Sequence, residues 1–315
     1  MMIEFRENLK IITVGFLVVF GFYFMFEMPI YFGRNNEVEA GTTATTSLEV
    51  GNASPSVSSV TLNAGSNIRL VEDGATTVSA TATITDTNGY ADIQEVLGRL
   101  FWSNSVNATN CTANINNCTA TTTCATSSCA GNNCLATCNF ALWFVATPTD
   151  ANAATWDCWI QVKDTKGTTT SATNTAQGIE VITLNALDVG NTINYGSLAP
   201  NAKNDPLDKL VRATTTGNAA IDANISGTDM CTSYPACNTA TTAVGWQQYA
   251  TTSGVAYDNA SAWVASTSVR LLEFSTVKPS ATPSDQGQAI YWGTWATQTS
   301  VGIYTGVNTF SAQSD

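Results

Sequence analysis

Histidine is absent from this chain of 315 residues. No other side chain has an unperturbed pKa near neutral pH, and imidazole is the commonest metal ligand in proteins. Its absence excludes Ser-His-Asp and Cys-His catalysis and the usual zinc sites. Carboxylates would then have to carry any hydrolysis, as paired acids do in glycosidases. Since no pattern marks two acids as a pair and no phosphate-loop or Gly-x-Ser-x-Gly motif occurs, we expect no catalytic residues and no enzyme.

Charged residues are also scarce, at 11% of the chain, and acids outnumber bases by 24 to 12. The first 34 residues contain three residues of each sign, so the acidic excess lies wholly in the remainder. An acidic surface repels phosphate backbones, which makes nucleic acid an unexpected partner.

The longest apolar run covers residues 11–32 and contains one charge, Glu27. About 20 apolar residues in a helix span a bilayer, so we predict an export or transmembrane helix over residues 1–33. Its N-terminus would stay inside and its C-terminus outside as a single-pass anchor. The alternative is a signal peptide cleaved near Ala40, after Val38-Glu39-Ala40. Length favours the anchor, because a signal-peptide core is shorter. Residues 34–55 lack an apolar period and predict a flexible spacer.

Nine cysteines follow this segment, with spacings that lack paired zinc knuckles. Beyond a membrane, disulfides are the better interpretation. Six of them fall in a Thr- and Asn-rich stretch, which predicts a disulfide-stapled loop inserted at residues 103–137, either a rigid decoration or a recognition tip. Cys138 and Cys158 could pair between neighbouring strands, and Cys231 and Cys237 could close a small loop. An odd number leaves at least one thiol free or intermolecular. The predicted disulfide residues, including that odd one, are Cys111, Cys118, Cys124, Cys129, Cys134, Cys138, Cys158, Cys231 and Cys237.

Apolar residues alternate with polar ones in several short segments bounded by Gly, Asn and Asp turns. The clearest segment is residues 77–86, and others cover residues 95–102, 138–144, 156–162 and 219–225. Further strands are expected at residues 269–274, and at 289–295 and 302–310 as a paired ending. Half-buried strands at this spacing predict an all-β chain of two β-sandwich domains, residues 56–183 and 184–315.

Three blocks carry a resemblance: Ala82-Thr-Ile-Thr-Asp-Thr-Asn-Gly89, Phe144-Val-Ala-Thr-Pro-Thr-Asp150 and Trp156-Asp-Cys-Trp-Ile-Gln-Val-Lys-Asp-Thr-Lys-Gly167. They resemble the Ig-like or PKD-like domains of exported, uncharacterised prokaryotic surface proteins. The resemblance implies two Ig-like sandwiches in tandem outside the cell and brings no catalytic residue with it.

Oxygen ligands gather in the Asp86-x-Asn88-Gly89-x-x-Asp92 turn, with Glu95 beyond it. Such groups suit a hard cation, so Asp86, Asn88, Asp92 and Glu95 are a candidate Ca²⁺ site. The similar turn Asp164-Thr-Lys-Gly167 carries a lysine in its middle, which argues against a cation there. We expect both to be hairpin turns first, with no cofactor, and the Ca²⁺ site is the alternative.

Paired tryptophans lie on two strands, Trp156 with Trp159 and Trp292 with Trp295. Alternation places one of each pair in the core and the other outside. Outward Trp159 and Trp295 are therefore candidates for stacking on a sugar.

These features favour a non-catalytic extracellular surface protein with a structural or adhesive role. The membrane is one expected partner, and a cell-surface glycan, a protein or a second copy of the chain is another. One alternative is a carbohydrate-binding module, and another is a pilin-like filament subunit, although Glu27 is one place from the position that a pilin requires after Gly21.

Overall fold

The computed structural model describes residues 44–104, 111–151, 153–174, 177–190, 192–260, 262–267, 269–270, 274–280 and 287–314. The chain divides into two compact units, Met1–Val50 and Gly51–Asp315, and every named strand belongs to the second. The expected N-terminal helix and the cleavage site near Ala40 lie outside the described residues. Within the described ranges, no helix is both long and apolar enough to cross a bilayer.

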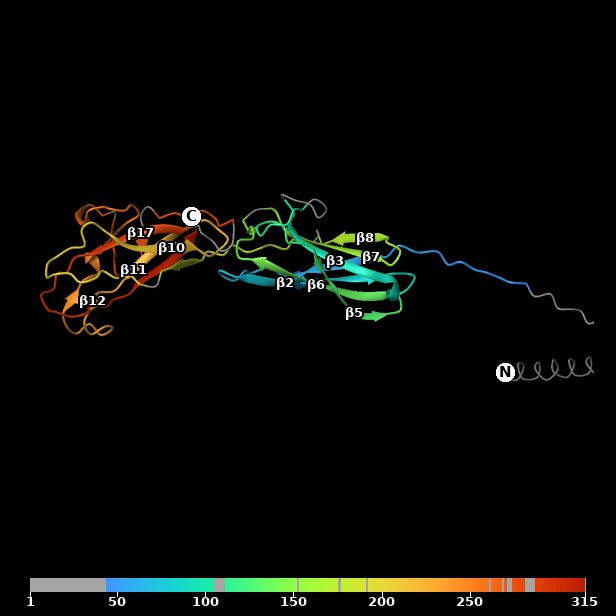
Figure 1. The fold of residues 1–315 in the computed structure, drawn as a ribbon, viewed down its shortest axis with the longest axis horizontal. Helices are drawn as coiled ribbons and strands as arrows, with labels where there is room; N and C mark the ends of the chain where they lie inside the picture. Colours follow the sequence, from blue (N-terminus) through green and yellow to red (C-terminus); the bar gives the residue numbers. More distant parts are fainter. Residues whose placement is uncertain are drawn as a thin grey trace, which may run out of the picture. The chain divides into compact units, whose positions relative to one another are not determined.

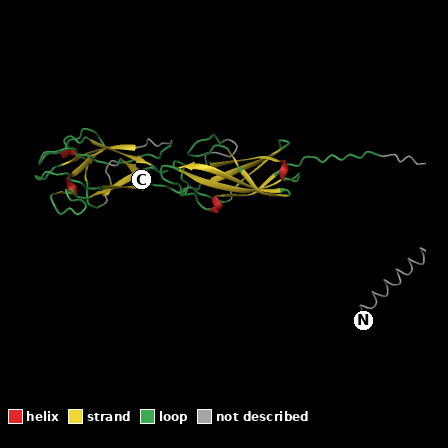
Figure 2. Cartoon of the chain, turned by 60° about the horizontal axis from the view of Figure 1, so that its bottom comes forward, coloured by secondary structure: helices red, strands yellow, loops and turns green. Residues whose placement is uncertain are grey.

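The described chain is all-β, and every pairing between named strands is antiparallel. Among the described residues, helical structure is confined to short 3-10 turns between strands (Figure 2). The strands of the first half are β1 (Ser56–Leu62), β2 (Ala75–Thr85), β3 (Ile93–Trp102), β4 (Thr122–Thr123), β5 (Ala125–Ala130), β6 (Asn133–Trp143), β7 (Trp156–Asp164) and β8 (Thr169–Thr173).

Two four-stranded sheets make up the first half, in the orders β1-β2-β6-β5 and β4-β3-β7-β8 (Figure 1). On β2, Val78, Ala80, Ala82 and Ile84 are at most 1% exposed, as the period-two pattern predicts. They share one core with residues of β6 from the same sheet and of β3 and β7 from the opposite sheet. Fully burying a valine or isoleucine side chain contributes roughly 1.5–3 kcal/mol. The result is a β-sandwich-like fold.

The cysteine-rich insertion is more ordered than the predicted loop at residues 103–137. It contains β4, β5 and the beginning of β6, so part of it extends the two sheets. The chain passes from one sheet to the other at Cys124, between β4 and β5, where Cys124 N–H donates to the Val96 carbonyl at 2.8 Å. Cys124 is disulfide-bonded to Cys138 of β6. The segment lacks large apolar side chains, so its disulfide-bonded cysteines take their place in the core.

The turn that contains Asp86 was expected to be a hairpin turn, and this is wrong. β2 pairs with β1 and β6, whereas β3 pairs with β4 and β7, so the turn crosses between the sheets. Only the companion turn at Asp164 joins two paired strands, β7 and β8. A crossing turn brings segments of both sheets together at one end of the sandwich.

The second half contains β9 (Leu187–Val189), β10 (Lys209–Thr215), β11 (Ile221–Gly227), β12 (Met230–Cys231), β13 (Thr241–Thr242), β14 (Gln247–Ala250), β15 (Ala262–Trp263), β16 (Val269–Arg270), β17 (Gly287–Thr294) and β18 (Asn308–Ser314). A five-stranded sheet has the order β15-β14-β17-β10-β9 and a three-stranded sheet the order β16-β11-β18. Side chains of both sheets form one core, in which Trp292 and Ile225 are 0% exposed.

The last two strands were expected to pair with each other, and this is wrong. β17 pairs with β10 and β14, whereas β18 pairs with β11 in the other sheet. Strand β18 also begins later than the predicted strand at residues 302–310. Alternation identified both strands, but it contains no information about which neighbour each strand meets.

Gly98 on β3 lies directly against the Cys124–Cys138 disulfide. A Cβ added at Gly98 would lie 2.7 Å from the Cys138 Sγ and 3.0 Å from the Cys124 Sγ. We therefore predict that Gly98→Ala lowers the free energy of unfolding by roughly 1–3 kcal/mol through overpacking. Denaturant unfolding measures this. The matched control is Gly245→Ala, where a Cβ meets nothing within 4 Å and little change is expected. Equal stability of the two variants would contradict the close packing.

Candidate functional site

Three carboxylates meet at the end of the first sandwich where the crossing turn lies. Asp86, Asp92 and Asp164 each place one oxygen within 4.8 Å of the oxygens offered by the other two. Asp86 follows β2, Asp92 ends the 3-10 turn Tyr90–Asp92, and Asp164 ends β7. Of the four predicted ligands, the structure brings Asp86 and Asp92 together. It adds Asp164, which the sequence interpretation had set aside because of its neighbouring lysine.

The turns at Asp86 and Asp164 have the same local geometry because both read Asp-Thr-x-Gly. In each, the aspartate Oδ1 accepts a hydrogen bond from the N–H two residues later, at 2.8 Å from Asn88 and 2.9 Å from Lys166. The glycine N–H then donates back to the aspartate carbonyl. Gly89 has φ 104° and Gly167 has φ 89°, which favour glycine. In the second turn, the lysine contributes its backbone N–H to the aspartate.

The two turns are joined by Thr165. Its N–H donates to the Asp92 carbonyl at 2.8 Å, and its hydroxyl donates to Asp92 Oδ1. The spacer reaches the same place: Asn52 Nδ2 donates to Asp164 Oδ2 at 2.8 Å. This bond, with the N–H groups of Thr168 and Lys166, holds the pKa of Asp164 below its usual value. Asp164 is therefore ionised at neutral pH.

Asp86 is 0% exposed, yet one of its oxygens lacks a partner. Oδ1 accepts from Asn88, whereas Oδ2 receives no hydrogen bond from any described residue. Buried carboxylate oxygens are normally satisfied by hydrogen bonds or by a cation. The unpartnered oxygen thus distinguishes this cluster from an ordinary surface group of acids.

Asn88 and Glu95, the other predicted ligands, lie outside the three-carboxylate cluster. Asn88 Oδ1 accepts from the N–H of Ala53 at 2.7 Å, so this side chain holds the spacer. Glu95 lies on β3 opposite Lys163, and both line a depression of about 400 Å³. One acid with one lysine is not the paired-acid arrangement that glycoside hydrolysis requires.

A second group of functional interest is the aromatic cluster of the second half, formed by Trp246, Trp263, Trp295 and Tyr257. The rings contact one another edge to face. The centroids lie 4.6 Å apart for Trp246 and Trp295, 5.8 Å for Trp246 and Trp263, and 6.2 Å for Tyr257 and Trp263. Tyr257 is 1% exposed, whereas Trp263 is 51% exposed. The aromatic cluster therefore has a buried base and one tryptophan that reaches solvent.

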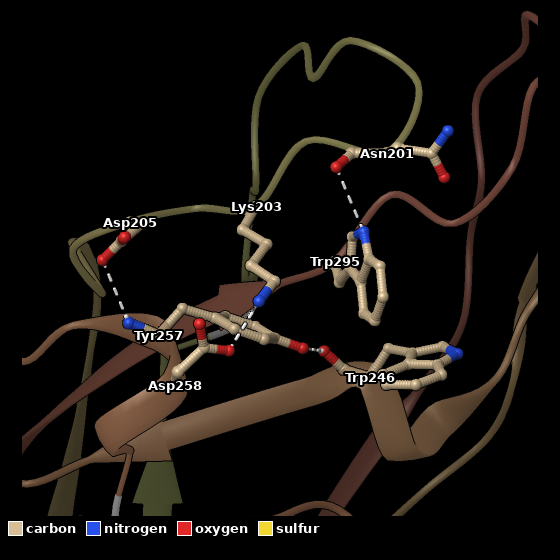
Figure 3. A network of polar contacts seen from close by, with 7 residues as sticks. All are labelled: Asn201, Lys203, Asp205, Trp246, Tyr257, Asp258 and Trp295. Carbon is tan, nitrogen blue, oxygen red and sulfur yellow. Dashed lines mark hydrogen bonds and ion pairs between the residues drawn. The ribbon is translucent and has the colours of Figure 1, made fainter.

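Lys203 lies on the aromatic cluster (Figure 3). Its Nζ is 5.0 Å from the Trp295 ring centroid and 5.1 Å from that of Tyr257, and it forms an ion pair with Asp258 at 2.5 Å. Cation–π contact favours this position of the ammonium group. Trp295 Nε1 donates to the Asn201 carbonyl at 3.2 Å. Because Lys203 covers one face of Trp295, the ring most available for stacking is Trp263.

Trp159, the other predicted stacking residue, packs against Phe101 and the Cys111–Cys118 disulfide. Its partner Trp156 is 0% exposed, so one tryptophan of each pair is in the core as expected. The sequence interpretation missed Trp246 and Trp263. Both belong to very short elements without an apolar period, so only their aromatic character could have pointed to them.

Four disulfides connect eight of the cysteines, including the expected Cys231–Cys237 pair. The expected pairing of Cys138 with Cys158 is wrong, because Cys138 is bonded to Cys124 and Cys158 is a buried free thiol. The bonded pairs are Cys111–Cys118, Cys124–Cys138, Cys129–Cys134 and Cys231–Cys237. Cys129 and Cys134 close the β5–β6 hairpin. The sequence predicted a stapled loop here but did not specify this pair.

Comparison of the chain with known protein families and with curated proteins finds no match.

Cys158 provides a test of the disulfide pattern. It is 0% exposed, and burial raises the pKa of its thiol to about 12, so the reactive thiolate is scarce at neutral pH. We predict that the folded protein does not react with Ellman's reagent, whereas unfolding without a reductant releases one thiol per chain. Thr169→Cys, which places a cysteine on an exposed position of β8, should react at once in the folded state. Reaction of the unsubstituted folded protein would contradict the assignment.

Proposed function

We propose that this chain is a non-catalytic extracellular protein with a structural or adhesive role at the cell surface. The observation that carries the proposal is the set of four disulfides. Disulfides form and persist in oxidising compartments, so a chain whose fold includes several of them belongs outside the cytosol. The apolar run at residues 11–32 supplies a route there, either as a single-pass anchor or as a signal peptide cleaved near Ala40.

We infer that the two halves are Ig-like modules in tandem. In the first, the sheets β1-β2-β6-β5 and β4-β3-β7-β8 have the order of strands A-B-E-D and C′-C-F-G of an Ig-type sandwich. In the second, β9-β10-β17 and β11-β18 repeat the A-B-E and C-F pairings. Modules of this kind commonly serve as spacers and binding scaffolds on cell surfaces. This topology therefore supports a role in presenting a binding surface and not in catalysis.

The chemistry of the described groups also supports a non-catalytic role. The free thiol of Cys158 is buried and has a raised pKa, which opposes its use as a nucleophile. Asp157 has a pKa raised mainly by burial, but it is 2% exposed and a substrate would not reach it. Glu95 lines a surface depression together with Lys163 and not with a second acid. A catalytic acid needs both a shifted pKa and access to substrate.

Labelling of intact cells tests the location. We expect a membrane-impermeant amine reagent to modify exposed lysines such as Lys166 on whole cells, while a cytoplasmic control protein is modified only after lysis. Mass spectrometry of the mature N-terminus then separates the two forms, since Met1 indicates an anchor and Gly41 a released protein. Labelling that requires lysis would contradict the proposal.

A second candidate function is carbohydrate binding through the aromatic cluster. The observation that favours it is the half-exposed ring of Trp263, which contacts Tyr257. Lys203 lies over Tyr257 and pairs with Asp258, so the aromatic cluster combines an exposed ring with hydrogen-bonding groups, as a sugar site requires. The exposed ring is Trp263 in place of Trp295, which the sequence suggested. This role is compatible with an adhesive surface protein.

Glycan binding tests this second candidate. On a glycan array, we expect Trp263→Ala to weaken any specific binding by at least about tenfold, or about 1.4 kcal/mol, through loss of the stacking surface. The control Trp143→Ala removes a tryptophan of the first half that is 38% exposed and should leave binding unchanged. Absence of binding by the folded, unsubstituted chain would remove the candidate.

A further inference from the structure

We propose that Asp86, Asp92 and Asp164 form a Ca²⁺ site that fastens the spacer to the first sandwich. The ligand set differs from the one that the sequence suggested, because Asp164 comes from a turn 72 residues beyond Asp92 and replaces Asn88 and Glu95. The site is independent of glycan binding and of the location of the protein.

The arrangement of oxygens fits this cation. Ca²⁺ binds six to eight oxygens at about 2.4 Å, so two ligands on opposite sides of the ion are about 4.8 Å apart. One oxygen from each of the three aspartates lies within that separation of the others. Mg²⁺ requires a tighter and more regular shell at about 2.1 Å, which three side chains from two separate turns satisfy less well. Water and backbone carbonyls complete the coordination of such an ion.

Two independent observations favour a positively charged partner for the cluster. Asp86 is 0% exposed and its Oδ2 has no hydrogen-bond donor among the described residues. The ion pairs found in the described ranges are Lys203–Asp258 and Lys209–Asp208, so no lysine or arginine there neutralises the three carboxylates by a direct ion pair. Like charges at this separation repel one another unless a cation lies between them.

A cation here would act on three segments of the chain. Asp86 and Asp92 belong to the turn that crosses between the sheets, and Asp164 belongs to the β7–β8 turn. The spacer is bound to both, through Asn52 on Asp164 and through the Ala53 N–H on Asn88. Fixing the carboxylates therefore also fixes the hydrogen-bond acceptors that hold the spacer. Calcium would control whether Asn52 and Ala53, near the end of the spacer, are held on the sandwich or released from it.

The test uses the full-length chain, purified in a mild detergent and freed of metal with EGTA. Isothermal titration with CaCl₂ should show one ion per chain, with a Kd in or below the range of about 10⁻⁴–10⁻³ M that is typical of extracellular sites. At a free Ca²⁺ concentration about 100 times Kd, the Tm should rise by about 5–10 °C. Absence of both responses would overturn the proposal, and an equal response to MgCl₂ would overturn the assignment to Ca²⁺.

Isosteric variants identify the ligands. Asp92→Asn and Asp86→Asn should each weaken Ca²⁺ binding by at least tenfold, whereas Glu95→Gln, three residues from Asp92, should keep the Kd within about twofold. In EGTA the two Asn variants should unfold at or above the Tm of the unsubstituted chain, because they remove like-charge repulsion. A lower Tm in EGTA with an intact Ca²⁺ response would mean a purely structural role and overturn the site.

Hydrogen exchange tests the connection to the spacer. The Ala53 amide, which donates to Asn88, should exchange several-fold more slowly with Ca²⁺ than with EGTA, and Asp92→Asn should abolish the difference. Calcium binding without any change at Ala53 would overturn the spacer connection.

Discussion

The burial of one face of every long strand against a second sheet is the constraint on which the rest of this structure depends. In both halves, the first two strands pair with each other, the second also pairs with a later strand, β6 or β17, and the third strand pairs within the opposite sheet. The two halves share this pattern without an alignable sequence repeat. Packing explains the likeness, because short alternating strands with few charges bury their apolar faces most completely as two opposed sheets.

Crossing between opposed sheets also determines where the polar groups collect. A chain that leaves β2 for β3 must turn at the end of the sandwich, and the β7–β8 hairpin turns at the same end. Two short Asp-Thr-x-Gly turns are thereby brought side by side, and Asn52 and Ala53 of the spacer each donate a hydrogen bond to one of them. Acids that are far apart in sequence become one cluster, so the geometry on which the proposed cation site rests is a consequence of sheet topology.

The burial of apolar faces between two sheets also decides which cysteines and tryptophans lie in the core and which lie at the surface. Cys124–Cys138 and Trp156 fill the first core, and Trp292 fills the second. The disulfide allows Thr- and Asn-rich sequence to enter the sandwich, because a crosslink limits the unfolded chain where apolar side chains are missing. Trp263 lies on the two-residue edge strand β15, and an edge strand has a neighbour on one side only, so its ring remains half-exposed.

Alternation alone was sufficient to determine the all-β class, the positions of β2, β7 and β11, and the burial of Trp156 and Trp292, because these depend on the period of two along a single strand. The missing histidine likewise restricted the possible chemistry without any structure. Pairing was decided only in three dimensions: Cys124 with Cys138, Asp164 with Asp86, and β18 with β11. Each of these joins residues whose proximity depends on the order of strands in a sheet. Local sequence does not specify that order, which emerges when all apolar faces are buried together.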